Sequence, residues 1–155
     1  MKKARLRELL ATKEGKAIHA FLAELSDYQQ SSGGRKARLR NRHASLSDEM
    51  RSAVSASASR LRGLWRGDEG QSRDPATSWT NGRSTAAFFG TYVFPVTDLS
   101  STSGSIDTEK VRRLIENVRE LEDHDVGDDE GEVILLDPVW KPMSRERMDR
   151  ERRAD

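Results

Sequence analysis

The chain has 155 residues, a net charge of +1 and no cysteine. This length fits a single domain, since one core usually serves about 100 to 200 residues. Without cysteine, disulfide frameworks, thiolate nucleophiles and zinc or iron–sulfur sites with Cys ligands are excluded. Leu, Ile, Val and Phe make up only 30 of the residues, so we expect a small core with loose ends.

Charge is unevenly distributed along the chain. Residues 1–66 hold 15 Lys and Arg against 6 Asp and Glu, whereas residues 106–137 hold 4 against 12. Such asymmetry favours contact of the basic block with nucleic acid or anionic lipid, or attraction between the two blocks or between copies of the chain. The cationic N-terminus lacks the apolar run of a signal peptide, and no apolar window is long enough for a membrane span. We therefore expect a cytoplasmic protein without a membrane partner.

The first half of the chain has helical periodicity in three places. Residues 2–28 fit two helical pieces, and residues 48–65 fit a third helix with Ser47 as its N-cap and apolar positions from Met50 to Trp65. Between them, residues 29–45 combine glycines with many charges and few apolar side chains. This composition predicts a linker or a helix that forms conditionally.

The second half predicts two strands around one helix. Residues 86–96 are aromatic and β-branched, which indicates a buried strand with Gly90 as a bulge, and residues 133–137 indicate a second strand stopped by Pro138. Between them, Asp107 is a suitable cap for a helix that runs to about Leu121. These elements predict a small α+β core, with a β-α-β unit as one arrangement.

The predicted organisation has four segments. They are a basic helical segment (1–28), an Arg-rich linker (29–46), a small α+β domain (47–140) and a charged tail (141–155).

The best candidate site is the basic run that follows Gly33 and Gly34. Its five cations are Arg35, Lys36, Arg38, Arg40 and Arg42. A cationic segment gains affinity for phosphates by releasing counterions, and it can become ordered on binding. A solvated linker remains the alternative, since no RNA-recognition, KH, zinc-finger or basic-zipper pattern accompanies the run. The connection between the flanking helices is also too long for a helix-turn-helix.

Tryptophans next to cations form a second candidate for nucleic-acid contact. Trp79 is near Arg83, and Trp65 and Trp140 also stand beside basic residues. Such pairs stack on bases while the cation contacts phosphate. Trp65 continues an apolar stripe and fits a core position, so we assign Trp79 and Arg83 to the predicted nucleic-acid contacts.

One stretch resembles a catalytic motif. Residues 133–142, VILLDPVWKP, are similar to the DPPW motif of the adenine-N6 methyltransferases, in which the acidic residue and prolines at a strand end receive a flipped base. The resemblance implies a catalytic role for Asp137 and a bound adenosyl cofactor. Val139 stands in the place of the second proline and no glycine-rich cofactor loop is present. We therefore interpret the stretch as a buried strand that ends at Asp-Pro.

Other catalytic or metal-binding patterns are weak. The acidic turn over residues 123–132 departs from the EF-hand pattern, and no G-x-S-x-G elbow or P-loop is present. We predict no catalytic residue, no metal and no cofactor.

These observations favour a small non-enzymatic accessory or regulatory protein that binds nucleic acid through its basic half, mostly by phosphate contacts. The alternative is a protein–protein interaction subunit or adaptor that uses amphipathic helices and the acidic patch, by self-association or with a different protein.

Overall fold

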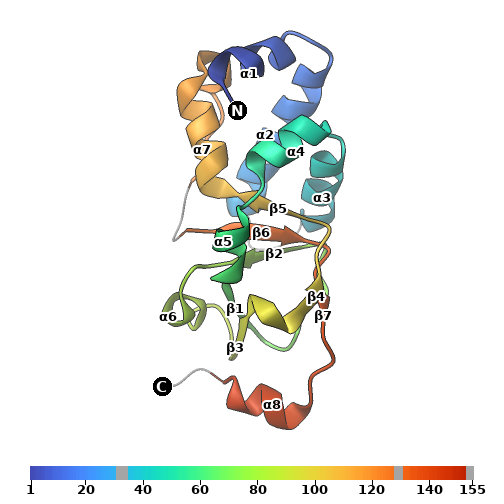
Figure 1. The fold of residues 1–155 in the computed structure, drawn as a ribbon, viewed down its shortest axis with the longest axis vertical. Helices are drawn as coiled ribbons and strands as arrows, with labels where there is room; N and C mark the ends of the chain where they lie inside the picture. The colour runs from blue at the N-terminus through green and yellow to red at the C-terminus, as the bar shows by residue number, and fades with distance from the viewer. Residues whose placement is uncertain (31–34, 128–130, 153–155) are drawn as a thin grey trace. The chain divides into compact units, whose positions relative to one another are not determined.

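The computed structural model describes residues 1–30, 35–127 and 131–152, and its elements are shown in Figure 1. The fold is α+β, as the sequence predicts, with helices and small antiparallel sheets. The chain divides into two compact units, which are described separately. The helical unit comprises residues 1–55 and 107–128, and the β unit comprises residues 56–106 and 129–155.

This division differs from the predicted segments. Residues 47–55 and 107–128 belong with the N-terminal helices rather than with the strands. The amphipathic helix that starts at Asp107 finds its apolar partners there, since Val111 and Val118 are both fully buried. Periodicity along a sequence identifies an apolar face but does not say which other face covers it.

The helical unit contains five α-helices and one 3-10 turn within the described residues. They are α1 (Lys3–Leu10), α2 (Glu14–Gln30), α3 (Lys36–Ala44), α4 (Asp48–Val54), α7 (Thr108–Asn117) and η2 (Arg119–Leu121). Ser47 and Asp107 cap α4 and α7 by accepting backbone N–H bonds from Met50 and Glu109, as their positions predict. Gly15 lets α2 turn closely against α1, because a Cβ at this position would lie 2.3 Å from the Leu10 carbonyl oxygen.

The predicted helix over residues 48–65 is interrupted. After α4, Ser55 is extended and Ser57 caps a separate short helix, α5 (Ala58–Arg62). The Ala56 amide donates to the Ser105 hydroxyl rather than to a carbonyl one turn earlier. The Ser55 hydroxyl donates to the Ser52 carbonyl, and local bonds of this kind compete with helical hydrogen bonding. Trp65 lies beyond α5 and begins a strand.

Among its described residues, the β unit holds three small sheets. In the first, β1 (Trp65–Asp68) pairs antiparallel with β3 (Tyr92–Pro95), and in the third, β4 (Leu99–Ser101) pairs with β7 (Val139–Trp140). The second sheet has the order β2–β6–β5, formed by Ala76–Trp79, Val133–Leu136 and Gly104–Asp107. All four residues of β6 are buried, which confirms the predicted strand. The other helical elements are α6 (Arg83–Ala86), η1 (Val96–Asp98) and α8 (Arg145–Arg150).

The strand predicted over residues 86–96 is correct only at its C-terminal end. Residues 92–95 form β3, whereas Phe88 and Phe89 lie in a turn after α6 with exposed fractions of 83% and 61%. Gly67 and Gly90 allow this turn to approach β1 closely, since a Cβ on Gly67 would lie 2.0 Å from the Ala86 carbonyl oxygen. The strands predicted over residues 86–96 and 133–137 do not share a sheet, because β3 and β6 belong to different sheets; β6 lies between β2 and β5, and α7 and η2 connect β5 to β6 along the chain.

The predicted charged tail contains a helix. Helix α8 is capped by Ser144, and Arg147 forms an ion pair of 2.5 Å with the buried Asp98. The Val93 amide donates to the Glu151 carbonyl at 2.6 Å. Residues 145–152 therefore pack within the β unit, and residues 153–155 lie outside the described part.

Candidate nucleic-acid interface

The predicted basic run forms helix α3 rather than a linker. Arg35 precedes its first turn, and Lys36, Arg38, Arg40 and Arg42 lie within it. Leu39 and His43 are buried on the side that packs against α2, and His43 lies at a centroid distance of 6.0 Å from the ring of Phe21. The two glycines before the run are outside the described residues, and so is the rest of segment 31–34. Leu39 and His43 are four positions apart, so they lie on the same face of α3 and pack against α2. The cations lie on the rest of the helix surface.

The five cations are positioned in two groups. Arg35, Arg38 and Arg42 follow one another at intervals of three and four residues, so they share one stripe, and all three are exposed. Lys36 and Arg40 share a second stripe and are half-buried. No acidic residue occurs between Asp27 and Asp48 in the sequence, so no carboxylate from α3 itself offsets these charges.

Carboxylates of α2 reach the first stripe. Arg35 Nη1 lies 3.4 Å from Asp27 Oδ2 and 3.9 Å from Glu24 Oε2, and Arg38 Nη1 lies 3.9 Å from Glu24 Oε1. The Glu24 side chain is only 9% exposed, and its Oε2 has no hydrogen-bond partner within the described residues. Distances of 3.4 to 3.9 Å exceed those of strong charge-assisted hydrogen bonds, so the exposed guanidinium groups of Arg35 and Arg38 keep most of their donors available for a phosphate.

The second predicted contact pair is not accessible as expected. Trp79 is completely buried, where it stacks on Trp140 at a centroid distance of 5.5 Å and donates its Nε1–H to Thr77 Oγ1. Its side chain therefore cannot stack on a base, and this part of the prediction is wrong. Arg83 instead lies over the ring of Trp65 at 5.5 Å. It belongs to the β unit, whereas the five cations of α3 belong to the helical unit.

The basic and acidic blocks meet inside the helical unit. Arg7 in α1 donates its Nε–H to Glu120 Oε2 at 3.1 Å, and both side chains remain about half exposed. A backbone hydrogen bond of Glu120, assisted by the Arg7 side chain, lowers the pKa of this carboxyl. The basic and acidic blocks, which are separate along the sequence, thus partly neutralise each other in the folded unit.

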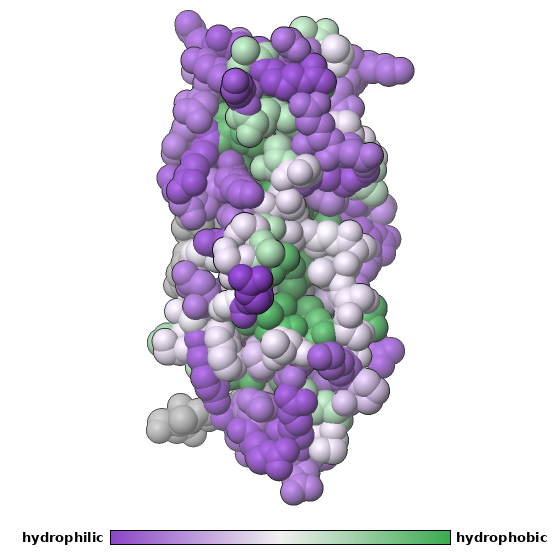
Figure 2. Space-filling view, in the orientation of Figure 1, coloured by the Kyte–Doolittle hydropathy of each residue, from purple (hydrophilic) through white to green (hydrophobic). Residues whose placement is uncertain are grey.

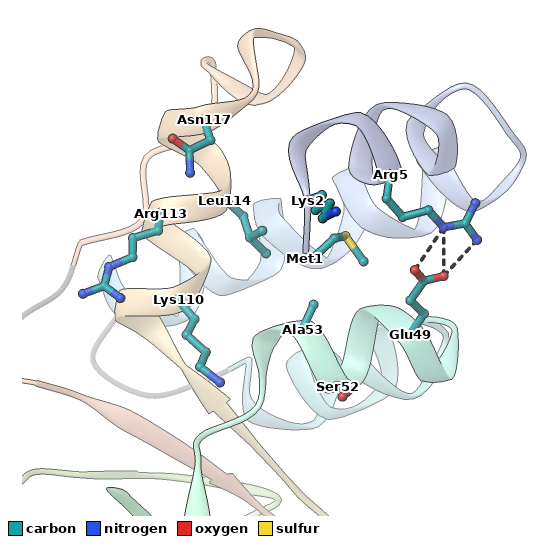
Figure 3. A pocket seen from close by; sticks show the side chains of 10 residues that line it. All are labelled: Met1, Lys2, Arg5, Glu49, Ser52, Ala53, Lys110, Arg113, Leu114 and Asn117. Carbon is teal, nitrogen blue, oxygen red and sulfur yellow. Dashed lines mark hydrogen bonds and ion pairs between the residues drawn. The ribbon is translucent and has the colours of Figure 1, made fainter.

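A cavity of about 700 Å3 lies among α1, α4 and α7 (Figure 3). Its wall includes Lys2, Arg5, Glu49, Lys110, Arg113 and Leu114. Arg5 makes hydrogen bonds of 2.9 to 3.1 Å with both oxygens of Glu49, which lowers the pKa of that carboxyl. No pattern in the sequence predicts this cavity, because its cations lie at the start of the chain and on α7, about 100 positions apart.

Two histidines that the sequence separates form a pair. His19 Nδ1 in α2 and His124 Nε2 lie 2.9 Å apart. Gln29 in the same helix donates to the Gly127 carbonyl at 2.8 Å and accepts from its amide. The residues after η2 are therefore docked along α2.

Within the described part of the chain, no three His, Asp or Glu side chains are grouped so as to hold a metal ion, and residues 128–130 of the acidic turn are outside that part.

Asp137 is part of a turn after β6. Its φ of 44° places it in the left-handed region, its amide donates to the Pro75 carbonyl at 2.8 Å, and its Oδ2 accepts from Ser103 Oγ at 3.1 Å. The Asp-Pro pair thus ends β6, in line with our interpretation of the DPVW stretch. These contacts give the carboxylate a role in fixing the turn.

The chain matches no protein-family model, no curated protein and no solved structure. Of the helices described, none has both the length and the apolar character needed to cross a membrane.

Proposed function

We propose that this chain is a non-enzymatic accessory or regulatory protein whose helical unit binds nucleic acid through phosphate contacts from α3. The observation that supports this most strongly is the arrangement of five cations around a helix whose opposite edge is anchored by Leu39 and His43. A helix held in this way presents its guanidinium groups without the full cost of ordering a flexible linker.

Phosphate contacts without base readout make the binding insensitive to sequence and sensitive to salt. Arginine forms bidentate hydrogen bonds with phosphate oxygens, and each neutralised phosphate releases counterions. The α3 surface has no exposed aromatic side chain among residues 35–45, so it has no stacking platform for unpaired bases. We therefore expect duplex and single strands to bind through the same charges.

The test uses the exposed stripe of α3 and a matched control. Fluorescence anisotropy with a labelled duplex compares the wild-type chain with the triple variant R35Q, R38Q and R42Q. The control is K13Q, K16Q and R62Q, which removes three other exposed cations. The proposal requires a large loss of affinity in the first variant and a much smaller loss in the second. Equal losses would mean that only net charge matters.

One observation favours the alternative of a protein-interaction subunit. Phe88 and Phe89 are adjacent and exposed, and they lie on a turn that Gly67 and Gly90 allow to approach β1 closely. Exposed aromatic pairs are typical anchors for an apolar pocket on a partner protein. Size-exclusion chromatography with light scattering tests self-association, and the variant F88S and F89S should abolish any dimer if this surface forms it. A dimer that persists in this variant would contradict a role of the turn in self-association.

A further inference from the structure

Part of the wall of the cavity among α1, α4 and α7 is apolar. Met1, Ala53 and Leu114 point toward one another across it in Figure 3. Figure 2 shows an apolar patch, surrounded by hydrophilic atoms, where Figure 1 draws these three helices. A volume of about 700 Å3 falls within the roughly 300 to 1,000 Å3 of small-molecule sites. A ring or another apolar group would gain free energy by covering this surface.

The charges around the cavity are mainly positive. Lys2, Lys110 and Arg113 line it together with one carboxylate, Glu49. That carboxylate already has a counterion, because Arg5 binds both of its oxygens. Arg113 is paired with Glu109, so Lys2 and Lys110 carry the surplus positive charge. The Lys110 ammonium is held in place by the Ser55 carbonyl at 2.8 Å, which leaves its charge unneutralised.

A second cavity of the same unit has a different balance. It has a volume of about 400 Å3, and its wall combines Lys3, Arg7 and Arg119 with Glu116 and Glu122. Arg7 is also engaged by Glu120. Mixed charge of this kind does not select an anion, so the surplus of cations distinguishes the larger cavity.

We infer that the larger cavity binds a phosphate ester attached to a ring, with Lys2 and Lys110 on the phosphate and Leu114 against the ring. A compact ammonium is a suitable point charge for a phosphate oxygen. Ser52 and Asn117 supply hydrogen-bonding groups at the edge of the cavity. The ester has two sources with the same chemistry, a free nucleotide or the phosphorylated 5′ end of a nucleic-acid strand. The second source depends on the proposed function.

Calorimetry with the full chain tests the free nucleotide. Adenosine 5′-monophosphate should bind more tightly than adenosine, and the variant K2Q and K110Q should weaken its binding by about tenfold or more, since charge-assisted hydrogen bonds are lost. Glutamine at position 110 keeps a donor for the Ser55 carbonyl, so we expect the variant to fold as the wild type does. The variant K13Q and K16Q, which removes two exposed lysines that do not line the cavity, serves as the control and should bind as the wild type does.

A second arm distinguishes the sources. A short oligothymidylate with a 5′ phosphate is compared with the same strand ending in a hydroxyl, in the wild-type chain and in the K2Q and K110Q variant. If the mononucleotide does not bind, the wild-type chain should still prefer the phosphorylated strand, and the K2Q and K110Q variant should lose this preference. This result would assign the cavity to strand ends. If neither the mononucleotide nor the 5′ phosphate gains affinity from these lysines, the inference is wrong. The α3 variant R35Q, R38Q and R42Q should retain mononucleotide binding, so failure of the α3 proposal is detected separately.

Discussion

Arg7 and Glu120 are 113 positions apart in the sequence, yet the Arg7 Nε–H donates to Glu120 Oε2 at 3.1 Å. This contact joins the basic block (residues 1–66) to the acidic block (residues 106–137). It shows that part of the charge separation serves cohesion within the helical unit. The charges that serve binding must therefore be sought among the cations that remain, of which α3 holds the densest group.

The Arg7–Glu120 pair should contribute little to the free energy of unfolding. This contribution should require opposite charges at the two positions. Exposed ion pairs contribute weakly and are screened by salt. We expect R7E to destabilise the chain slightly and the exchanged variant R7E and E120R to recover most of the loss. Urea unfolding at low and high salt measures both. No recovery in the exchanged variant would show that the two side chains do not interact in solution.

Replacing Glu24 by Gln should strengthen nucleic-acid binding. The buried Glu24 carboxylate lies 3.9 Å from both Arg35 and Arg38, so it lowers the potential at the surface that we assign to phosphate. Removing this charge should raise duplex affinity by about two- to tenfold at low salt, in line with the contribution of a single charge near a surface. Anisotropy measures the change, and D48N is the control on an exposed carboxylate outside α3. Unchanged or weaker binding in E24Q would place the phosphates elsewhere.

Acid should destabilise the chain through His43. Burial, with a smaller effect of Arg51, lowers the pKa of His43 from its usual 6.5 to about 4. The unfolded chain then binds a proton at a higher pH than the folded chain does, so stability is full above about pH 6.5 and falls as the pH approaches 4. His124 acts in the same direction, since burial and then His19 lower its pKa.

The measurement is urea unfolding across this pH range for the wild-type chain and for H43L. Leucine removes the proton site while it fills the space beside Phe21, so stability should depend less on pH in the variant. An identical pH dependence in the two proteins would show that His43 is not buried in its neutral form.

Two glycines should differ sharply in their tolerance of alanine. A Cβ on Gly67 would lie 2.0 Å from the Ala86 carbonyl oxygen, whereas a Cβ on Gly63 would have no neighbour closer than 3.8 Å. G67A should cost about 3 kcal/mol, as forced repacking typically does, and G63A should leave the free energy of unfolding nearly unchanged. Thermal unfolding of both variants tests this. A stable G67A would mean that the turn carrying Phe88 and Phe89 does not approach β1 closely.

Local signals in the sequence were sufficient where the structure depends on neighbours along the chain. The caps at Ser47 and Asp107 and the buried strand over 133–136 were all predictable, because capping and apolar runs act over a few residues. Phe88 and Phe89 were wrongly predicted to lie in a buried strand, because their position depends on contacts distant in the sequence. Their exposure depends on the approach of Gly67 to Ala86, a contact between segments that no local pattern encodes.

The cationic residues of the candidate site were predictable from the sequence, but the way in which α3 packs and presents them was not. The basic run is visible in the sequence, whereas its helix is stabilised by Leu39 and His43 against α2 and thus by tertiary contacts. The burial of Trp79 follows from its stack with Trp140, which is distant in the sequence. The cavity lined by Lys2 and Lys110 is likewise formed by helices from both ends of the helical unit.

The measurement that tests the central claim most directly is duplex binding by anisotropy at about 50 and 200 mM salt, with the wild-type chain and the variant R35Q, R38Q and R42Q. We expect the wild type to lose affinity about 100-fold across this range, as for roughly four phosphate contacts. We also expect a shallower salt dependence and weak binding for the variant. Binding by the variant that equals the wild type at both salt concentrations would contradict the assignment of α3 as the phosphate-binding surface.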